Sequence, residues 1–128
     1  MRVTVDLDTP AVADILESWD LLSQHGDGIV WGRVSSSGKG VHLEVHGVDS
    51  DVADRLRVAA GDDRKRIWYD AVTDLKPKQI LFDRKNGRQA QEWTTSHQDV
   101  IDRYRQTAPI ALRRRYLQVC YPVCRRYL

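Results

Sequence analysis

The chain has 128 residues and a mass of 14.7 kDa, the size of one domain with room for a short appendage. Apolar residues make up 41% of the sequence and charged residues 30%, which excludes a disordered chain, and two cysteines are too few for a disulfide scaffold or a four-ligand zinc site. No apolar run is long enough to cross a membrane, and the start MRVTVDLD carries acids where a signal peptide needs an apolar segment. We therefore expect an intracellular, cytoplasmic protein with no membrane partner.

Charge is distributed unevenly along the chain, although the net charge is only +2. Residues 1–63 contain 5 basic and 12 acidic side chains, whereas residues 64–128 contain 15 basic and 6 acidic ones. An acidic first half and a basic second half suit a protein that gathers a cation and faces a polyanion. A solvated surface with unevenly placed charges is the alternative.

The hydrophobic pattern predicts alternating strands and helices along most of the chain. Thr9-Pro10 is expected to begin the first helix, with threonine as the cap and proline at the first helical position. The expected elements are a strand at 2–8, a helix at 11–23, strands at 29–35 and 41–46, a helix from 49 or 50 to 61, strands at 66–70 and 79–83, and helices after residue 89 that are broken near Pro109.

This element order is the split β-α-β pattern of ferredoxin-like and RRM-like domains. We expect an α+β fold with an antiparallel sheet of order 4-1-3-2, helices on one face and an open second face. Residues 1–88 would form this core, and residues 89–128 would form a basic helical extension packed on it.

Asp6 and Asp8 are the first candidate site residues, because side chains two apart on a strand leave the same face. Val5 and Leu7 would face the helices, which places both carboxylates on the open face. Adjacent carboxylates repel each other unless a cation neutralises them, and hard oxygen ligands suit Mg²⁺ or Mn²⁺. Two solvated acids at a strand end are the alternative interpretation.

A second candidate group follows on the expected hairpin, in the run 35–42 with sequence SSSGKGVH. Its glycines let a phosphate approach the backbone, where exposed N–H groups can bind an anion. Ser37, Lys39 and His42 add a hydroxyl, a positive charge and a ring N–H. The set suits a nucleoside triphosphate, while an ordinary turn followed by a strand histidine is the alternative.

A third carboxylate is expected at the end of the fourth strand. Asp70 ends RIWYD and Asp83 ends QILFD, so both have the same local form. We favour Asp70, because the topology makes its strand the fourth and places it beside the first.

These residues resemble, in order, the three motifs of the archaeo-eukaryotic primase superfamily, which includes the primase-polymerases. The first family motif is an apolar strand ending in D-x-D, here with Asp6 and Asp8. The second, S-G-x-G-x-H, resembles residues 37–42, and the third, an apolar residue and Asp, resembles Tyr69-Asp70. The resemblance covers roughly residues 1–85. It departs from the family in starting its first motif at residue 3 and in showing no zinc-binding module.

The resemblance implies an RRM-like core that makes or extends nucleic-acid strands by two-metal phosphoryl transfer in DNA replication. Asp6, Asp8 and Asp70 would hold two Mg²⁺ or Mn²⁺ ions. Ser37, Lys39 and His42 would grip the incoming triphosphate. The partners would be a nucleic-acid template or primer and nucleoside triphosphates; whether the protein works with a partner subunit or as a homodimer stays open.

Basic residues beyond the core offer further contacts to a nucleic-acid backbone. The C-terminal arginines interleave with tyrosines, a composition suited to phosphate and base contacts, or to a helix that docks its apolar face on the core. Cys120 and Cys124 are expected to be buried thiols. The candidate backbone contacts are Arg66, Lys76, Lys78, Arg84, Lys85 and Arg88, with Arg113, Arg114, Arg115, Arg125, Arg126, Tyr116, Tyr121 and Tyr127 in the C-terminal stretch.

Two rival functions stay open. A rolling-circle-type replication nuclease would use His42, Glu44 and His46 as metal ligands and Tyr104 or Tyr116 as the nucleophile. An RRM-like binding module without catalysis is the other rival, although acids and a histidine occupy the central positions where RNA-binding domains carry aromatic residues.

Overall fold

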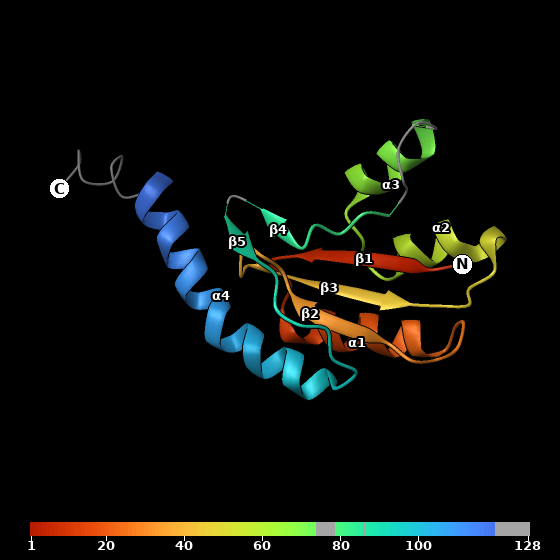
Figure 1. Ribbon diagram of the computed structural model, residues 1–128, viewed down its shortest axis with the longest axis horizontal. Coiled ribbons are helices and arrows are strands. Elements are labelled where there is room, and N and C mark those ends of the chain that lie inside the picture. Colours follow the sequence, from red (N-terminus) through yellow and green to blue (C-terminus); the bar gives the residue numbers. More distant parts are fainter. Residues whose placement is uncertain (74–78, 86, 120–128) are drawn as a thin grey trace.

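The computed structural model describes residues 1–73, 79–85 and 87–119, with side chains as far as Pro109. This part of the chain is α+β, as expected, with a three-stranded antiparallel sheet, a separate two-stranded sheet and four helices (Figure 1). The elements are β1 (Val3–Asp8), α1 (Val12–Ser23), β2 (Trp31–Val34), β3 (Gly40–Val45), α2 (Ser50–Ala59), α3 (Arg64–Val72), β4 (Arg84–Lys85), β5 (Arg88–Gln89) and α4 (His97–Val119).

The main sheet has the order β1-β3-β2. Asp6 lies opposite His42, and His42 lies opposite Arg33, so these three polar residues form one row across the sheet. The neighbouring row contains Val5, Leu43 and Gly32 and points to the other face. The alternation read from the sequence therefore does divide the sheet into a polar face and an apolar face.

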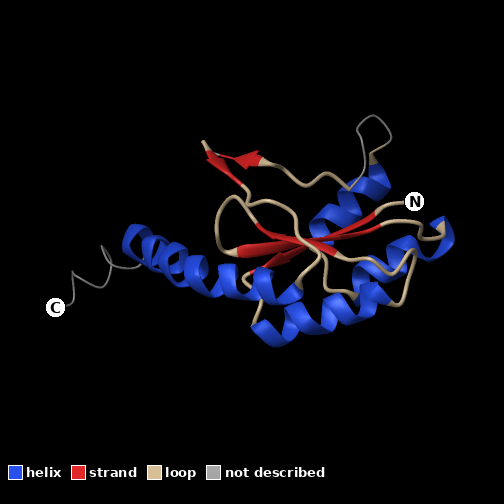
Figure 2. Cartoon of the chain, turned by 60° about the horizontal axis from the view of Figure 1, so that its bottom comes forward, coloured by secondary structure: helices blue, strands red, loops and turns tan. Residues whose placement is uncertain are grey.

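Three helices cover the apolar face: α2 contacts β1, α1 contacts β3, and α4 contacts β2 and β3. Figure 2 shows this helical layer beneath the sheet, with the β4–β5 hairpin on the other side. Trp19 of α1 packs directly over Gly32, where an added Cβ would lie 2.5 Å from the indole ring. Glycine at this position thus lets the helix approach the sheet closely.

The first helix starts later than expected. Thr9 does not cap it; this residue has a positive φ of 46° and forms the bend after β1. The helix begins at Val12 with Ala11 at the cap position, and the Asp14 carboxylate accepts the Ala11 N–H at 2.9 Å. An acid inside the first turn therefore replaces the threonine cap.

Residues 66–70, predicted to be the fourth strand, lie in α3 instead. The Asp63 side chain accepts the Lys65 N–H at 2.9 Å and caps this helix, and α3 has no buried residue. A cap before a short stretch of long side chains therefore outweighs the strand preference of Ile67, Trp68 and Tyr69. The complete order 4-1-3-2 is not formed by the described residues.

Residues 79–83, the other predicted strand, are irregular, and only their first residue, Gln79, is hydrogen-bonded along the free edge of β1. The Gln79 side chain accepts the Thr4 N–H at 2.8 Å and donates to the Arg2 carbonyl at 2.9 Å. One side-chain amide thus makes the two hydrogen bonds that a neighbouring strand would have made.

The predicted break at Pro109 is also absent, because α4 continues through this residue. Its first half is fixed in the core by Val100, Ile101 and Tyr104, and the Tyr104 hydroxyl donates to the Pro10 carbonyl at 2.7 Å. Pro109 is exposed, so water can reach the helical carbonyl group that proline leaves unpaired. No helix in the described residues is long and apolar enough to cross a membrane.

Several predicted residues lie outside this description. They are Lys76, Lys78, Cys120, Cys124, Tyr121, Arg125, Arg126 and Tyr127, together with the side chains of Arg113, Arg114, Arg115 and Tyr116.

Candidate functional site

A cavity of about 430 Å³ lies over the polar face of the sheet, at the end of β1. It collects side chains from β1, the β2–β3 turn, β3, the start of α3 and the segment before β4. Of the predicted site residues it brings together the two acids of the first motif and the three residues of the second. Its lining is Asp6, Asp8, Ser35, Ser36, Ser37, Lys39, Gly40, His42, Asp63, Arg66, Ile80, Leu81, Phe82 and Lys85.

Asp6 and His42 face each other across the β1–β3 pair, with 3.8 Å between Asp6 Oδ1 and His42 Nε2. Burial raises the pKa of Asp6 to about 6 from its ordinary value of 3.8, and Arg66 opposes this rise. The charges of Asp62, Asp63 and Asp8 raise the pKa further. Asp6 is therefore a partly buried carboxylate whose ionised form is disfavoured chiefly by the loss of water around it.

His42 is neutral at physiological pH. Burial lowers its pKa to about 3 from 6.5, and the charges of Arg33 and Arg66 lower it further against the opposing charge of Asp83. Its Nδ1 accepts the Arg33 Nε–H at 3.0 Å, so the ring proton must be on Nε2. His42 thus presents an N–H donor on the side where Asp6 lies.

Arg33 organises this face, although the sequence analysis did not single it out. It is only 4% exposed, pairs with Asp83 at 2.6 Å and stacks on Trp93, with 4.3 Å from its guanidinium carbon to the ring centre. It also donates to the carbonyls of Leu81 and Phe82. The available signal was a single charged residue inside an apolar strand, in the position that pairs with His42.

Backbone N–H groups of the β2–β3 turn form hydrogen bonds within the turn itself. The N–H groups of Gly38, Lys39 and Gly40 donate to the Ser35 carbonyl, Ser37 Oγ and Ser35 Oγ, respectively. The predicted backbone anion site at these three positions is therefore not formed. Among the side chains of the turn that line the cavity, Lys39 carries the positive charge.

Arg66 adds a second positive charge from α3. Its guanidinium donates to Thr4 Oγ1 at 2.9 Å and to the Ile80 carbonyl at 3.2 Å, and it pairs with Asp62. Arg66, expected to contact a nucleic-acid backbone, lies in the wall of the cavity. Of the other proposed backbone contacts, Lys85 lines the cavity, and Arg84 and Arg88 are exposed.

Neither predicted third carboxylate joins Asp6 and Asp8. Asp70 lies on α3, where it pairs with buried Arg57 at 2.9 Å and accepts the Gln79 N–H at 3.0 Å. Asp83 is held by Arg33. Asp70 is displaced because its segment is a helix rather than a central strand, and the carboxylate that does reach the cavity is Asp63, the cap of α3.

Described residues that the nuclease alternative would use as metal ligands or nucleophile have other contacts in the structure. Glu44 pairs with His46, and His42 is engaged by Arg33. The Tyr104 hydroxyl is buried against Pro10 and is not presented to a substrate.

The donor set fits one divalent cation completed by a substrate. Among described residues, no group of three or more histidine, cysteine, aspartate or glutamate side chains is placed to hold a metal ion. Mg²⁺, however, is commonly held by one or two carboxylates together with substrate phosphates. Asp6 and Asp8 supply such a pair on one face of β1. The ligands for a second ion are not assembled.

The chain was compared with protein-family models, curated proteins and solved structures, and none of the three comparisons found a match.

Proposed function

We propose that this protein is a nucleotidyltransferase of the primase and primase-polymerase type, which binds a nucleoside triphosphate on the polar face of its sheet and transfers the nucleotide to a nucleic-acid strand. One observation carries the proposal: a single cavity is lined by Asp6 and Asp8 from β1 and by Lys39 and His42 from the β2–β3 turn and β3. Carboxylates for a cation and donors for phosphate oxygens are the two halves of a metal–triphosphate site.

Each residue has a distinct role in this proposal. The His42 Nε2–H donates to a phosphate oxygen, and Lys39 and Arg66 neutralise phosphate charge without moving a proton. The Ser37 hydroxyl adds a further donor. Because these groups come from different elements of one sheet face, they hold the triphosphate in one orientation, and positioning is most of what phosphoryl transfer needs.

Asp6 and Asp8 would hold Mg²⁺ or Mn²⁺ against the same phosphates. When bound, the cation neutralises the charge that develops on the leaving pyrophosphate. Phe82, with 62% of its surface exposed at the rim of the cavity, offers an aromatic face on which a nucleobase can stack. Asp70 has no part in this site, because its carboxylate forms an ion pair with Arg57.

The decisive experiment is extension of a labelled primer on a template with Mg²⁺ or Mn²⁺. The double variant Asp6→Asn/Asp8→Asn should lose at least about a hundredfold in rate, since metal-ion stabilisation contributes several kcal/mol. Asp20→Asn/Asp54→Asn is the matched control, because it removes two acids from exposed positions outside the cavity. Equal rates for the two double variants would contradict the proposal.

Binding is tested separately from chemistry. Titration with a fluorescent nucleoside triphosphate should show Lys39→Ala weaker than the wild type by about tenfold, which is the value of one charge-assisted contact to a phosphate. Unchanged affinity in Lys39→Ala and in His42→Ala would place the triphosphate elsewhere.

A second candidate function is a nucleotide- or nucleic-acid-binding module without catalysis. The observation that favours it concerns the two predicted third carboxylates: Asp70 and Asp83 are each engaged by an arginine, Arg57 and Arg33 respectively, and neither joins Asp6 and Asp8. Triphosphate binding that depends on Lys39, together with no incorporation in Mg²⁺ or Mn²⁺, would select this candidate.

A further inference from the structure

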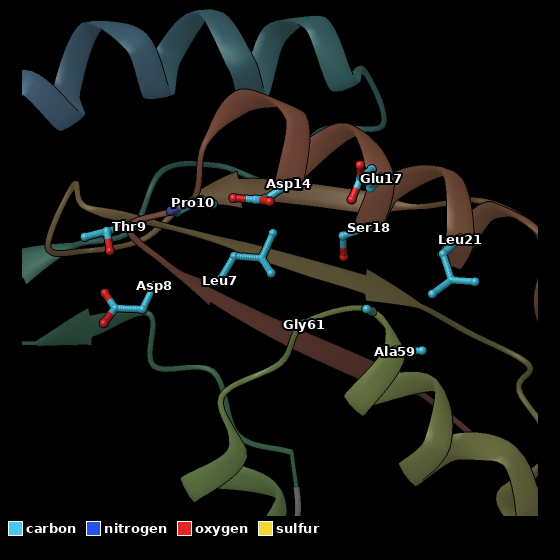
Figure 3. Close-up of a pocket in the computed structure, with 11 residues that line it drawn as sticks. Leu7, Asp8, Thr9, Pro10, Asp14, Glu17, Ser18, Leu21, Ala59 and Gly61 are labelled. Atoms are coloured by element: carbon cyan, nitrogen blue, oxygen red, sulfur yellow. The ribbon is translucent and has the colours of Figure 1, made fainter.

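A second cavity, of about 410 Å³, lies on the helical side of β1, between α1 and the end of α2. Figure 3 shows it with Leu7 at its centre, α1 along one side and the loop at Gly61 along the other. It is separate from the site proposed above, except that Asp8 borders both cavities.

The lining of this cavity combines an apolar floor with acids. Leu7 and Leu21 provide apolar surface, whereas Asp8, Asp14 and Glu17 provide carboxylates. Among the residues that the structure describes, no basic side chain lines it. Asp14 accepts one backbone N–H, from Ala11, through one of its oxygens. An acidic rim of this kind would attract a cation but does not by itself identify one.

Ser18 supplies an independent indication that the cavity receives a ligand. The residue is only 3% exposed, and its Oγ has no hydrogen-bond partner in the described part of the chain. A serine inside a helix usually satisfies its hydroxyl through the carbonyl four residues earlier or through solvent. Ser18 lines the cavity, and Figure 3 shows its hydroxyl directed from α1 toward the loop at Gly61. A buried hydroxyl without a partner is costly, and a ligand donor would satisfy it.

The chemistry of the lining selects the kind of ligand. Its acids do not form a group of three placed around a metal ion, as is true throughout the described residues. A bare divalent cation would also gain nothing from Leu7 and Leu21. A ligand with both methylene groups and an ammonium group would use both parts of the lining, because the methylenes bury apolar surface and the ammonium donates up to three hydrogen bonds.

We propose that this cavity binds a linear aliphatic amine of the polyamine class. The alkyl chain would lie along Leu7 and Leu21. An ammonium group would donate to Ser18 Oγ and pair with Glu17, and the second ammonium group would face Asp14 and Asp8 near the start of α1.

The test is a titration of the ¹⁵N-labelled full chain with 1,5-diaminopentane, followed by amide chemical shifts. Saturable shifts are expected at Ser18 and Gly61. The uncharged 1,5-pentanediol, which has the same length, should produce none of them at equal concentration. Glu17→Gln should weaken binding about fivefold, the value of one partly solvated ion pair, whereas Asp54→Asn, an exposed acid on α2, should leave it unchanged.

Ser18→Ala provides a second measurement that keeps the proposal falsifiable. The variant should unfold at a higher denaturant concentration, because it removes an unsatisfied buried hydroxyl and alanine favours a helix, and it should bind the diamine about fivefold more weakly. A hydroxyl with only a structural role would not produce weaker binding in a more stable protein. Equal binding of the diol and the diamine, equal weakening by Glu17→Gln and Asp54→Asn, or no binding at all would each overturn the proposal.

Discussion

Single residues on the polar face of the sheet set the electrostatics of the candidate site. Burial, with the nearby charge of Arg33, keeps the His42 imidazole neutral, whereas the Asp6 carboxylate has no comparable partner among the described residues. Arg66 stands nearby, but it is already shared with Asp62 and Thr4. The ionised form of Asp6 therefore costs folding free energy.

This cost predicts a pH-dependent stability difference between the wild type and Asp6→Asn. Because the pKa of Asp6 is raised from 3.8 to about 6 on folding, the folded state holds more protons than the unfolded state between these values. The contribution of Asp6 to stability is thus present below about pH 4 and is lost as the pH rises through about 6. In chelator at about pH 7, Asp6→Asn should be more stable by about 1 to 2 kcal/mol, a figure reduced for the third of the side chain that water reaches.

Urea unfolding at a series of pH values measures this difference. The two proteins should converge near pH 4, where the wild-type carboxyl is protonated in both states. Asp54→Asn serves as the control, because it removes an exposed acid and should change stability by less than about 0.5 kcal/mol. A wild type that is as stable as Asp6→Asn at neutral pH would show that the carboxylate carries no burial cost.

Among the elements, the edge of β1 departs most from a simple sheet. The fourth strand is replaced by α3 and by the irregular segment 79–83, which begins at the β1 edge and reaches Arg33 on the far strand. This segment is attached by side chains, through Gln79 at one end and the Arg33–Asp83 pair at the other. Residues 80–82 thus form one wall of the cavity, whereas a regular fourth strand would have left this face of the sheet open.

Gln79→Ala should therefore destabilise the protein by about 1 to 3 kcal/mol, because it leaves the buried Thr4 N–H without an acceptor. Gln79 also has a positive φ of 59°, so Gln79→Gly, which loses the same amide but relieves the backbone, should cost less than Gln79→Ala. Denaturant unfolding ranks the three proteins, and amide exchange at Thr4 should accelerate in both variants. Unchanged exchange at Thr4 would contradict the edge-capping role.

At the scale of the whole molecule, one hydrophobic core joins the sheet to the C-terminal helix. Val100, Ile101, Tyr104 and Ala108 of α4 belong to the same buried cluster as the β1 and β3 valines. Residues on both sides of the boundary expected at residue 88 therefore contribute to the same hydrophobic core. The first half of α4 is part of the structure that holds the candidate site in place.

Removal of α4 should consequently unfold the rest of the chain. A version ending at residue 96 loses four buried core residues, each worth roughly 1 to 3 kcal/mol, which is a large part of the stability of a small domain. A version ending at Pro109 keeps these contacts and should remain folded. Circular dichroism and cooperative thermal unfolding distinguish the two outcomes; a cooperative transition in the shorter version would show that residues 1–96 fold independently.

Much of the site geometry follows from local pattern alone. The alternation in VTVDLD and in VHLEV put Asp6 and His42 on the polar side of their strands, and the short turn between β2 and β3 made the two strands of that hairpin neighbours. The valine and leucine positions on the other side likewise predicted the core. These predictions hold because strand periodicity and hairpin connection are local properties, which few long-range contacts can reverse.

The tertiary structure decided the rest, beginning with Asp70. The residues Ile67, Trp68 and Tyr69 favour a strand, but the segment forms a helix that the Asp63 side chain caps and that the Arg57 pair to Asp70 holds. The residues 81–83 that Arg33 contacts are 48 to 50 residues away in the chain, and the partners of the Gln79 side chain are 75 to 77 residues away. The alternation of side chains along a strand is a property of the strand itself, but the partner of a buried charge is determined by where distant segments meet, and no pattern within one segment contains that information.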